Sequence, residues 1–280
     1  VQEKGGFMSQ LKIKEKKNPF AFLANLITIL ILVVAIGVCA YAGWNLYKIF
    51  SEYKAGSDEY AKISDMVVTE KQAEVKDETW VDKETKKKVW TAPLEIDYDK
   101  LSEINPDFVG WLYVEALPDI SYPIVHYKDN DFYLHRTFEK QDNFAGTIFT
   151  DCQNKKKLED SNTIIYGHNM KNGSMFGQLK QFKLPETIQK SKYIWVLTKE
   201  EACKYEIFSC YTAEVGSDTY TLIKGPGKGL VEYADKMQAK DTLGLSKREF
   251  DVKDKIITLS TCTGNEATRY VVQAVKVEPG

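Results

Sequence analysis

The chain is poor in the residues that build metal sites and disulfide frameworks. It has three histidines and five cysteines in 280 residues, and no two cysteines have the Cys-x-x-Cys spacing of a structural zinc site. The odd number of cysteines and their wide separation do not fit the dense pattern of a small disulfide-stabilised domain. We therefore expect no metal and no cofactor.

An excess of charge of one sign is also missing. The chain has 38 basic and 40 acidic residues and a formal net charge of -2, which gives no reason to expect nucleic acid as a partner. Internal repeats and low-complexity tracts are absent from the sequence as well. With 43% hydrophobic residues, the length suits one membrane anchor and one globular domain of roughly 200 residues.

One long stretch, residues 18–47, has no charged side chain. A helix over it would be about 45 Å long, which exceeds the ~30 Å hydrocarbon core of a bilayer. We expect an uncleaved transmembrane anchor with a cytoplasmic N-terminus, because four lysines precede it and Trp44 and Tyr47 suit the outer interface. A cleaved secretory signal is the alternative, but the apolar run is longer than a typical signal core. The four lysines are Lys12, Lys14, Lys16 and Lys17.

The remaining segments follow from this anchor. We expect a cytoplasmic N-terminus over residues 1–17, a charged and partly helical stalk and linker over residues 48–91, and a folded domain over residues 92–280. Helical composition within the stalk covers Ala55 to Val75. Residues 4–8 could be encoded by a purine-rich ribosome-binding sequence followed by a start codon. We therefore also predict that translation begins at Met8 and that Val1 to Phe7 are not translated.

The folded domain reads as mostly β. Eight short β-type runs alternate with turn signals and lack a regular βαβ alternation, which predicts a closed or nearly closed, antiparallel-rich barrel. A short helical pattern after Tyr98 ends at Asn105, and helical interruptions are expected at Ser174–Lys183 and Gly229–Ala239. The expected strands are Gly110–Val114, Ile124–Tyr127, Gly146–Thr150, Thr163–Tyr166, Tyr193–Leu197, Lys204–Glu214, Lys255–Ser260 and Tyr270–Lys276.

Cys262 follows a buried-type strand and precedes a glycine turn. A nucleophile at a strand end is held rigidly and still reaches solvent. Seven residues later, Arg269 opens the next apolar strand, so a short loop would bring both residues to the same end of the sheet. A guanidinium in that position stabilises an oxyanion or clamps a peptide carbonyl.

His168 occupies a matching position, after the run Ile164–Tyr166 and Gly167. A cysteine and a histidine are the minimal pair for acyl transfer through a thioester. A lone cysteine is more often a small core residue, and a lone histidine is more often structural. The residues by themselves leave the catalytic and the structural interpretation open.

Longer segments carry a family resemblance. Residues 258–263 read TLSTCT and are followed by Arg269, which resembles the TLxTC…R signature of the sortases. Residues 166–179, YGHNMKNGSMFGQL, are similar to the histidine segment of class B sortases. Four further segments resemble the family, so that the resemblance covers roughly Tyr98 to Lys276. These four are residues 104–112, 120–125, 129–134 and 146–151.

The resemblance implies an eight-stranded sortase-type β-barrel with N-terminal helices and a helix in the loop before the strand that carries Cys262, preceded by one transmembrane helix. It makes Cys262 the nucleophile, His168 the general acid and base, and Arg269 the substrate clamp. His126 and His135 have no counterpart in the motif and are expected to be structural or surface residues. Further candidates for substrate contacts are Tyr166, Asn169, Ser174, Met175, Ser260, Thr261 and Glu266, of which Glu266 is also a candidate for orienting Arg269.

The implied function is that of a transpeptidase on the outer face of a Gram-positive-type cell membrane. Such an enzyme cuts the C-terminal sorting signal of a secreted protein after threonine, holds the product as a thioester, and transfers it to an amine of a cell-wall (peptidoglycan) precursor or a pilin. One alternative is a hydrolytic cysteine peptidase on the same scaffold. Another is a non-catalytic wall-binding module, and the intact Cys262, His168 and Arg269 disfavour this second alternative. Class B members often act on NPxTN-like signals, but the sequence does not identify the motif or the acceptor.

Protonation adds a constraint on this chemistry. At reference pKa values, only about 3% of a cysteine is thiolate and about 24% of a histidine is imidazolium at pH 7. Enzyme that carries the thiolate and the imidazolium at the same time is then below about 1% of the total, if the two groups titrate independently. Either the folded site shifts these pKa values or the enzyme works with a small active fraction.

Overall fold

The structure is a computed structural model that describes residues 19–70, 79–82, 88–262 and 264–279. The chain divides into two compact units, Val1–Ser51 and Glu52–Gly280. The expectations for residues 1–17, including the start at Met8, lie outside the described residues.

Helix α1 (Pro19–Val67) is 49 residues long and crosses the boundary between the units. In the first unit its side chains are apolar and exposed, as at Leu30, Ile31 and Val34. By length and composition this is the one candidate membrane span among the described residues. The expectation of an apolar N-terminal helix that can span a membrane is confirmed.

The second part of α1 belongs to the folded unit. Tyr60, Ile63 and Val67 are buried in the main hydrophobic core, because their spacing of three and four residues places them on one face of the helix. Strand β1 (Val68–Glu70) follows directly and pairs with β4 (Leu94–Ile96). The compact unit begins at Glu52, within the segment that the sequence suggested as a stalk.

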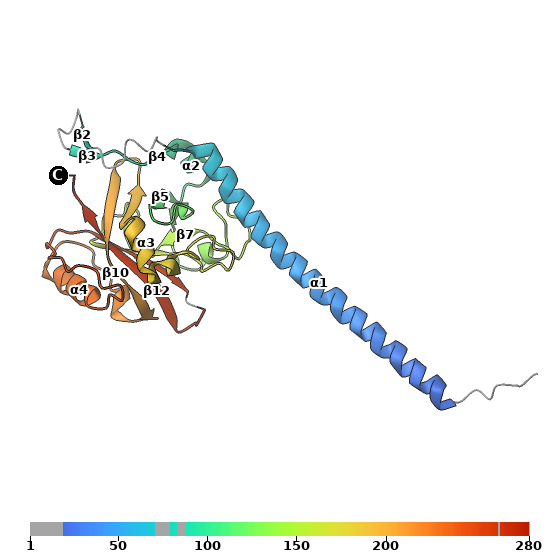
Figure 1. Ribbon diagram of the computed structural model, residues 1–280. Helices are drawn as coiled ribbons and strands as arrows, with labels where there is room; N and C mark the ends of the chain where they lie inside the picture. Colours follow the sequence, from blue (N-terminus) through green and yellow to red (C-terminus); the bar gives the residue numbers. More distant parts are fainter. Residues whose placement is uncertain (1–18, 71–78, 83–87, 263, 280) are drawn as a thin grey trace, which may run out of the picture. The chain divides into compact units, whose positions relative to one another are not determined.

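Eight strands form one closed barrel in the order β10-β12-β11-β8-β7-β6-β5-β9 (Figure 1). The expected eight-stranded barrel is confirmed, and each of the eight expected runs overlaps one of its strands. Two neighbouring pairs, β6 with β7 and β8 with β11, are parallel, and the others are antiparallel. The barrel strands are β5 (Phe108–Val114), β6 (Ser121–His126), β7 (Ile148–Thr150), β8 (Asn162–Tyr166), β9 (Tyr193–Leu197), β10 (Ala202–Glu214), β11 (Ile256–Cys262) and β12 (Thr268–Val277).

Helices fill the connections between these strands. Helix α4 (Lys228–Gln238; Figure 1) lies between β10 and β11 in sequence, close to the expected Gly229–Ala239. It buries Leu230, Tyr233, Ala234 and Met237 in a second core cluster. The other elements are α2 (Tyr98–Ile104), α3 (Pro185–Lys190), the short turns η2 (Phe132–Leu134), η3 (Leu179–Lys183) and η4 (Asp218–Tyr220), and the hairpin of β2 (Thr79–Val81) with β3 (Lys88–Trp90).

The helix expected over Ser174–Lys183 is wrong in its first half. Only η3 is helical there, and it is a 3₁₀ turn. Gly173 and Met175 have positive φ angles of 84° and 53°, which an α-helix does not allow. The apolar residues at this point follow helical spacing, but their segment is a folded loop that carries His168 at its start.

Candidate active site

Three neighbouring strands bring the candidate catalytic residues to one edge of the barrel. Strand β11 ends at Cys262, β12 begins at Thr268, and β8 ends at Tyr166, two residues before His168. Strand β11 lies between the other two, antiparallel to β12 and parallel to β8. The C-terminal ends of β8 and β11 and the N-terminal end of β12 therefore lie together.

The strand register places the three residues more closely. Ser260 is the register partner of Tyr166 in the parallel pair. Cys262 follows Ser260 by two residues and His168 follows Tyr166 by two residues, so the two occupy equivalent positions after their strands. Gly167 N–H continues this pairing and donates to the Ser260 carbonyl at 3.2 Å. Cys262 is itself the register partner of Arg269 in the antiparallel pair. The side chain of Cys262 and residue 263 lie outside the described part of the structure.

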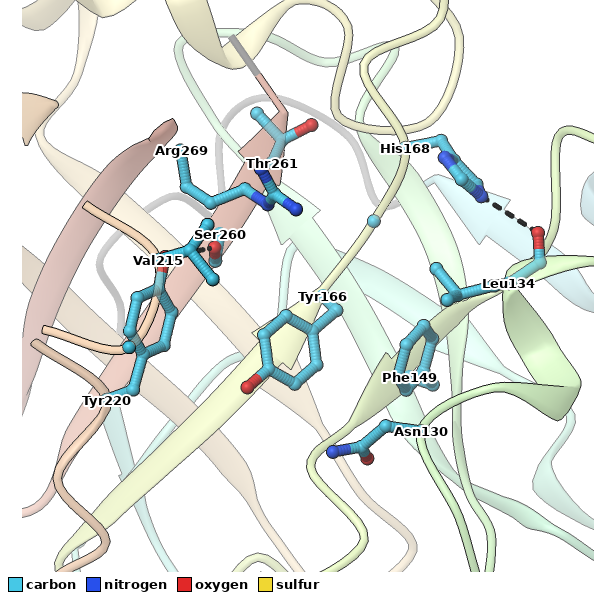
Figure 2. Close-up of a pocket in the computed structure, with 12 residues that line it drawn as sticks. Asn130, Leu134, Phe149, Tyr166, His168, Val215, Tyr220, Ser260, Thr261 and Arg269 are labelled. Atoms are coloured by element: carbon cyan, nitrogen blue, oxygen red, sulfur yellow. Dashed lines mark hydrogen bonds between the residues drawn. The ribbon is translucent and has the colours of Figure 1, made fainter. Parts of the chain in front are cut away.

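His168 is oriented by a main-chain carbonyl. Its Nε2 lies 2.8 Å from the Leu134 oxygen (Figure 2). A carbonyl only accepts hydrogen bonds, so Nε2 carries a proton and Nδ1 is the nitrogen left for proton exchange in the neutral ring. The loop after His168 folds back on it, because Phe176 N–H donates to the His168 carbonyl at 3.0 Å.

Burial disfavours the charged form of His168. Desolvation lowers the pKa of this imidazole below its ordinary 6.5, and the nearby His135 lowers it further, while the hydrogen bond to Leu134 opposes the shift. The imidazolium fraction at neutral pH is therefore smaller than the reference value suggests. On the histidine side, the folded site does not relieve the protonation constraint.

Arg269 is held by the loop that precedes it. Its Nη1 donates to the carbonyls of Glu266 and Thr268, each at 2.9 Å. Among the described residues, no group accepts a hydrogen bond from its Nε or Nη2, so these two can donate toward a ligand. Glu266 thus contacts Arg269 through its main-chain oxygen, and its own side chain is exposed.

A cavity of about 410 Å³ opens between these strand ends (Figure 2). Its lining is mostly apolar and aromatic with a few polar groups, which is the usual character of a ligand pocket. The lining residues are Asn130, Leu134, Phe149, Tyr166, Gly167, His168, Val215, Gly216, Tyr220, Ser260, Thr261 and Arg269.

Two tyrosines, with Phe149, form the aromatic part of this lining. The rings of Tyr166 and Tyr220 are stacked with their centroids 6.4 Å apart, and the Tyr220 hydroxyl lies 3.0 Å from Ser260 Oγ. The Tyr166 hydroxyl donates to Asp151 Oδ2 at 3.0 Å, where Asn130 Nδ2 also donates at 2.9 Å. Burial, then the charge of Asp151, raises the pKa of Tyr166. Tyr166 therefore stays protonated and presents a fixed ring to the cavity.

The candidate substrate residues separate into two groups. Tyr166, Ser260 and Thr261 line the cavity, together with His168 and Arg269. The others lie in the loop after His168 or in the loop before β12, outside that lining. Met175 is buried and its N–H donates to the Tyr122 hydroxyl, Ser174 bonds the side chain of Asn172, and Asn169 forms a bridge with Met175.

His126 and His135 have other surroundings. His126 Nδ1 lies 2.8 Å from the hydroxyl of Thr150 within the barrel, and His135 lies 4.0 Å from exposed Asp131. Neither lines the cavity.

Several cavity residues escaped the sequence analysis. Tyr220, Val215 and Gly216 come from the segment between β10 and α4, which has no motif that marks it. Asn130 and Leu134 belong to residues 129–134, a segment that resembles the family, so that resemblance was the available signal.

Comparisons with known proteins agree with this geometry. A family model described as the sortase domain matches residues 112–277. The chain belongs to the sortase family. Sortase B of Listeria monocytogenes is 38% identical over 181 residues, which are 62% of this chain and 71% of the relative. Sortase B of Staphylococcus aureus is 29% identical over 182 residues, 64% of this chain and 74% of the relative.

Solved structures place the chain in class B. The crystal structure of sortase B from Bacillus anthracis in complex with AAEK1 has a TM-score of 0.65 and 30% identity, covering 82% of this chain and 100% of that one. A substrate complex of Staphylococcus aureus sortase B has a TM-score of 0.59 and 29% identity, covering 65% of this chain and 85% of that one. As a class B sortase, the chain is a cysteine transpeptidase.

Proposed function

We propose that this sortase cleaves the sorting signal of secreted proteins after threonine and holds the acyl group as a thioester on Cys262. The parallel pairing of β8 with β11 carries the proposal, because it sets Cys262 and His168 at equivalent positions after neighbouring strands. The register partner of Cys262 is a guanidinium-bearing residue, Arg269. A nucleophile, a proton carrier and a charge stabiliser thus come from three adjacent strands.

Each of the three residues has one role in the proposed reaction. The Cys262 thiolate attacks the threonine carbonyl, and the carbon–sulfur bond forms as the carbonyl oxygen becomes an oxyanion. Arg269 stabilises that oxyanion through the Nε and Nη2 groups that its loop leaves available. His168, as imidazolium, gives its Nδ1 proton to the leaving amine when the peptide bond breaks, while Nε2 stays bound to Leu134.

The acceptor in the proposed second half-reaction is an amine of a cell-wall precursor or a pilin. Neutral His168 takes a proton from this amine at Nδ1 as it attacks the thioester, and the Cys262 thiolate leaves. One amide is exchanged for another, so no external energy source is needed. The apolar walls formed by Leu134, Phe149 and Val215 limit the competing attack by water.

The membrane topology is part of the same proposal. Residues 18–47 form the anchor, the N-terminus is cytoplasmic, and the unit that begins at Glu52 is extracytoplasmic. Sorting signals of secreted proteins and wall precursors both meet the enzyme on that side of the membrane.

Mass spectrometry of the full chain in detergent tests the chemistry. The enzyme is incubated with an NPxTN-type peptide, with and without hydroxylamine as the added amine. We expect an acyl adduct on Cys262 and a product whose threonine is joined to hydroxylamine. Cys262→Ala abolishes both, whereas Cys152→Ala, at a half-buried cysteine outside the cavity lining, keeps both. A product that never contains the added amine would instead identify a hydrolytic peptidase.

A further inference from the structure

The part of α1 in the folded unit makes repeated contacts with one loop of the barrel, residues 134–147. Asn143 Nδ2 donates to the Glu52 carbonyl at 2.9 Å, and Glu139 N–H donates to Glu59 Oε1 at 2.9 Å. The Tyr53 and Phe144 rings pack edge to face, with their centroids 4.7 Å apart. This helix segment therefore holds the loop along its length.

Tyr60 makes the most buried of these contacts. Its hydroxyl donates to the Gly146 carbonyl at 2.7 Å and lies 3.1 Å from Thr147 Oγ1. The side chain is 7% exposed, and burial raises its pKa, so the hydroxyl keeps its proton and remains a donor. Its ring packs edge to face on Tyr122 at 5.4 Å.

The residues that Tyr60 binds lie directly against the carbonyl that orients His168. Gly146 has a φ angle of 60°, and a Cβ there would lie 2.5 Å from the Tyr133 oxygen and 2.8 Å from the Leu134 oxygen. Thr147 N–H donates to the Tyr133 carbonyl at 2.9 Å. The Leu134 oxygen is the acceptor for His168 Nε2 at 2.8 Å.

A second set of contacts reaches the other side of the histidine. Tyr122, on which the Tyr60 ring packs, accepts the Met175 N–H at 3.0 Å. Met175 precedes Phe176, whose N–H donates to the His168 carbonyl at 3.0 Å. Tyr60 thus bonds the residues beside the Leu134 carbonyl, and Tyr122 links it to the loop that holds the His168 backbone.

We propose that Tyr60 is a positioning residue for His168, acting through Gly146, Thr147 and the Leu134 carbonyl. The part of α1 that begins at Glu52 then helps to position the active-site histidine. The effect of Tyr60 on turnover rests on the proposed role of His168 as the proton carrier, whereas its effect on the position of the His168 imidazole does not. Tyr60→Phe isolates the hydroxyl, because it keeps the aromatic ring and its contact with Tyr122.

The deciding measurement is the tautomer of His168, read by ¹⁵N NMR on the full chain in detergent with ¹⁵N-labelled histidine. With three histidines in the sequence, assignment by single substitution is practical. Wild type is expected to show the Nε2–H form, and Tyr60→Phe a mixed tautomer population. With an NPxTN-type peptide, kcat is expected to fall about three- to tenfold, the effect of losing one well-placed hydrogen bond, while KM is unchanged.

The matched control is Ile63→Val, on the same helix and fully buried. It removes one methylene and lowers Tm, but it leaves every hydrogen bond to the loop in place. We expect wild-type tautomer and kcat for this variant. A Tyr60→Phe protein with wild-type tautomer and with loss of Tm alone would overturn the proposal. A changed tautomer with unchanged kcat would support the positioning and refute the proton-transfer role of His168.

Discussion

Replacement of Gly167 by alanine tests whether close packing behind His168 controls catalysis. Gly167 lies between strand β8 and the histidine. A Cβ at this position would lie 2.5 Å from Ile148 Cδ1 and 2.7 and 2.8 Å from two ring atoms of Phe176. Real Cβ atoms essentially never approach so closely, so something has to move.

Ile148 and Phe176 are both completely buried, so neither side chain has open space to move into. Phe176 is completely buried, and its N–H is bonded to the His168 carbonyl, so a shift of the ring displaces the histidine. Overpacking of this kind costs about 1–3 kcal/mol of folding free energy. For a domain of this size, each kcal/mol lowers Tm by about 2–4 °C. A misplacement of about 1 Å in a catalytic group costs on the order of 100-fold in rate.

We therefore expect Gly167→Ala to lower kcat/KM by at least about tenfold, with a modest loss of Tm. Peptide cleavage and differential scanning calorimetry measure the two effects. Phe176→Leu in the same chain makes room for the new methyl group and is expected to restore part of the activity. Gly229→Ala is the matched control, because no atom lies within 4 Å of a Cβ at that helical position. Wild-type kcat/KM and Tm in Gly167→Ala would refute the reasoning.

Three further outcomes are expected. Because burial lowers the pKa of His168, the acidic limb of kcat/KM is expected below pH 6.5. The unfolded chain then binds the proton more tightly than the folded one, so the contribution of His168 to stability is present above pH 6.5 and is lost as the pH falls through the folded pKa. Titration of activity with pH, and urea unfolding of wild type and His168→Gln over the same pH range, measure the two effects. Arg269→Lys is expected to lower kcat/KM about 100-fold, because one ammonium cannot bond two loop carbonyls and still reach the oxyanion, while unfolding changes by under about 0.5 kcal/mol. Asp151→Ala is expected to cost about 1–3 kcal/mol in urea unfolding, because it leaves the half-buried donors of Tyr166 and Asn130 without their acceptor.

Each of these has its own control. An acidic limb above pH 6.5, or a limb that persists in the urea profile of His168→Gln, would contradict the assignment to His168. Arg248→Lys changes a half-buried arginine outside the cavity and should keep full activity; an equal loss there would remove the case for Arg269. Asp131→Ala removes an exposed carboxylate, and a similar loss of stability in that variant would show that burial of Asp151 is not the cause.

The amino-acid sequence by itself determined the barrel and predicted where along the chain the chemistry lies. Alternating apolar residues bounded by turns predicted the barrel strands, because strand formation depends on local pattern and on burial of one face. Cys262, His168 and Arg269 were found as polar residues at strand ends, within segments that resemble the sortases. The uncharged stretch at residues 18–47 likewise carries its own signal, because transfer into a bilayer depends on composition.

Only the tertiary structure decided how the site is supported. The acceptor of His168 is a carbonyl of Leu134, and a main-chain oxygen has no signature in the sequence. Tyr60 belongs to a segment that reads as a charged stalk, because three widely spaced apolar residues produce no clear pattern until the helix packs on the barrel. The helix expected at Ser174 gave way to a loop because Met175 takes a positive φ angle, which its bonds to Tyr122 and Asn169 stabilise. Contacts between residues far apart in the sequence set these features. The strands, by contrast, follow from the local pattern of apolar residues in each segment.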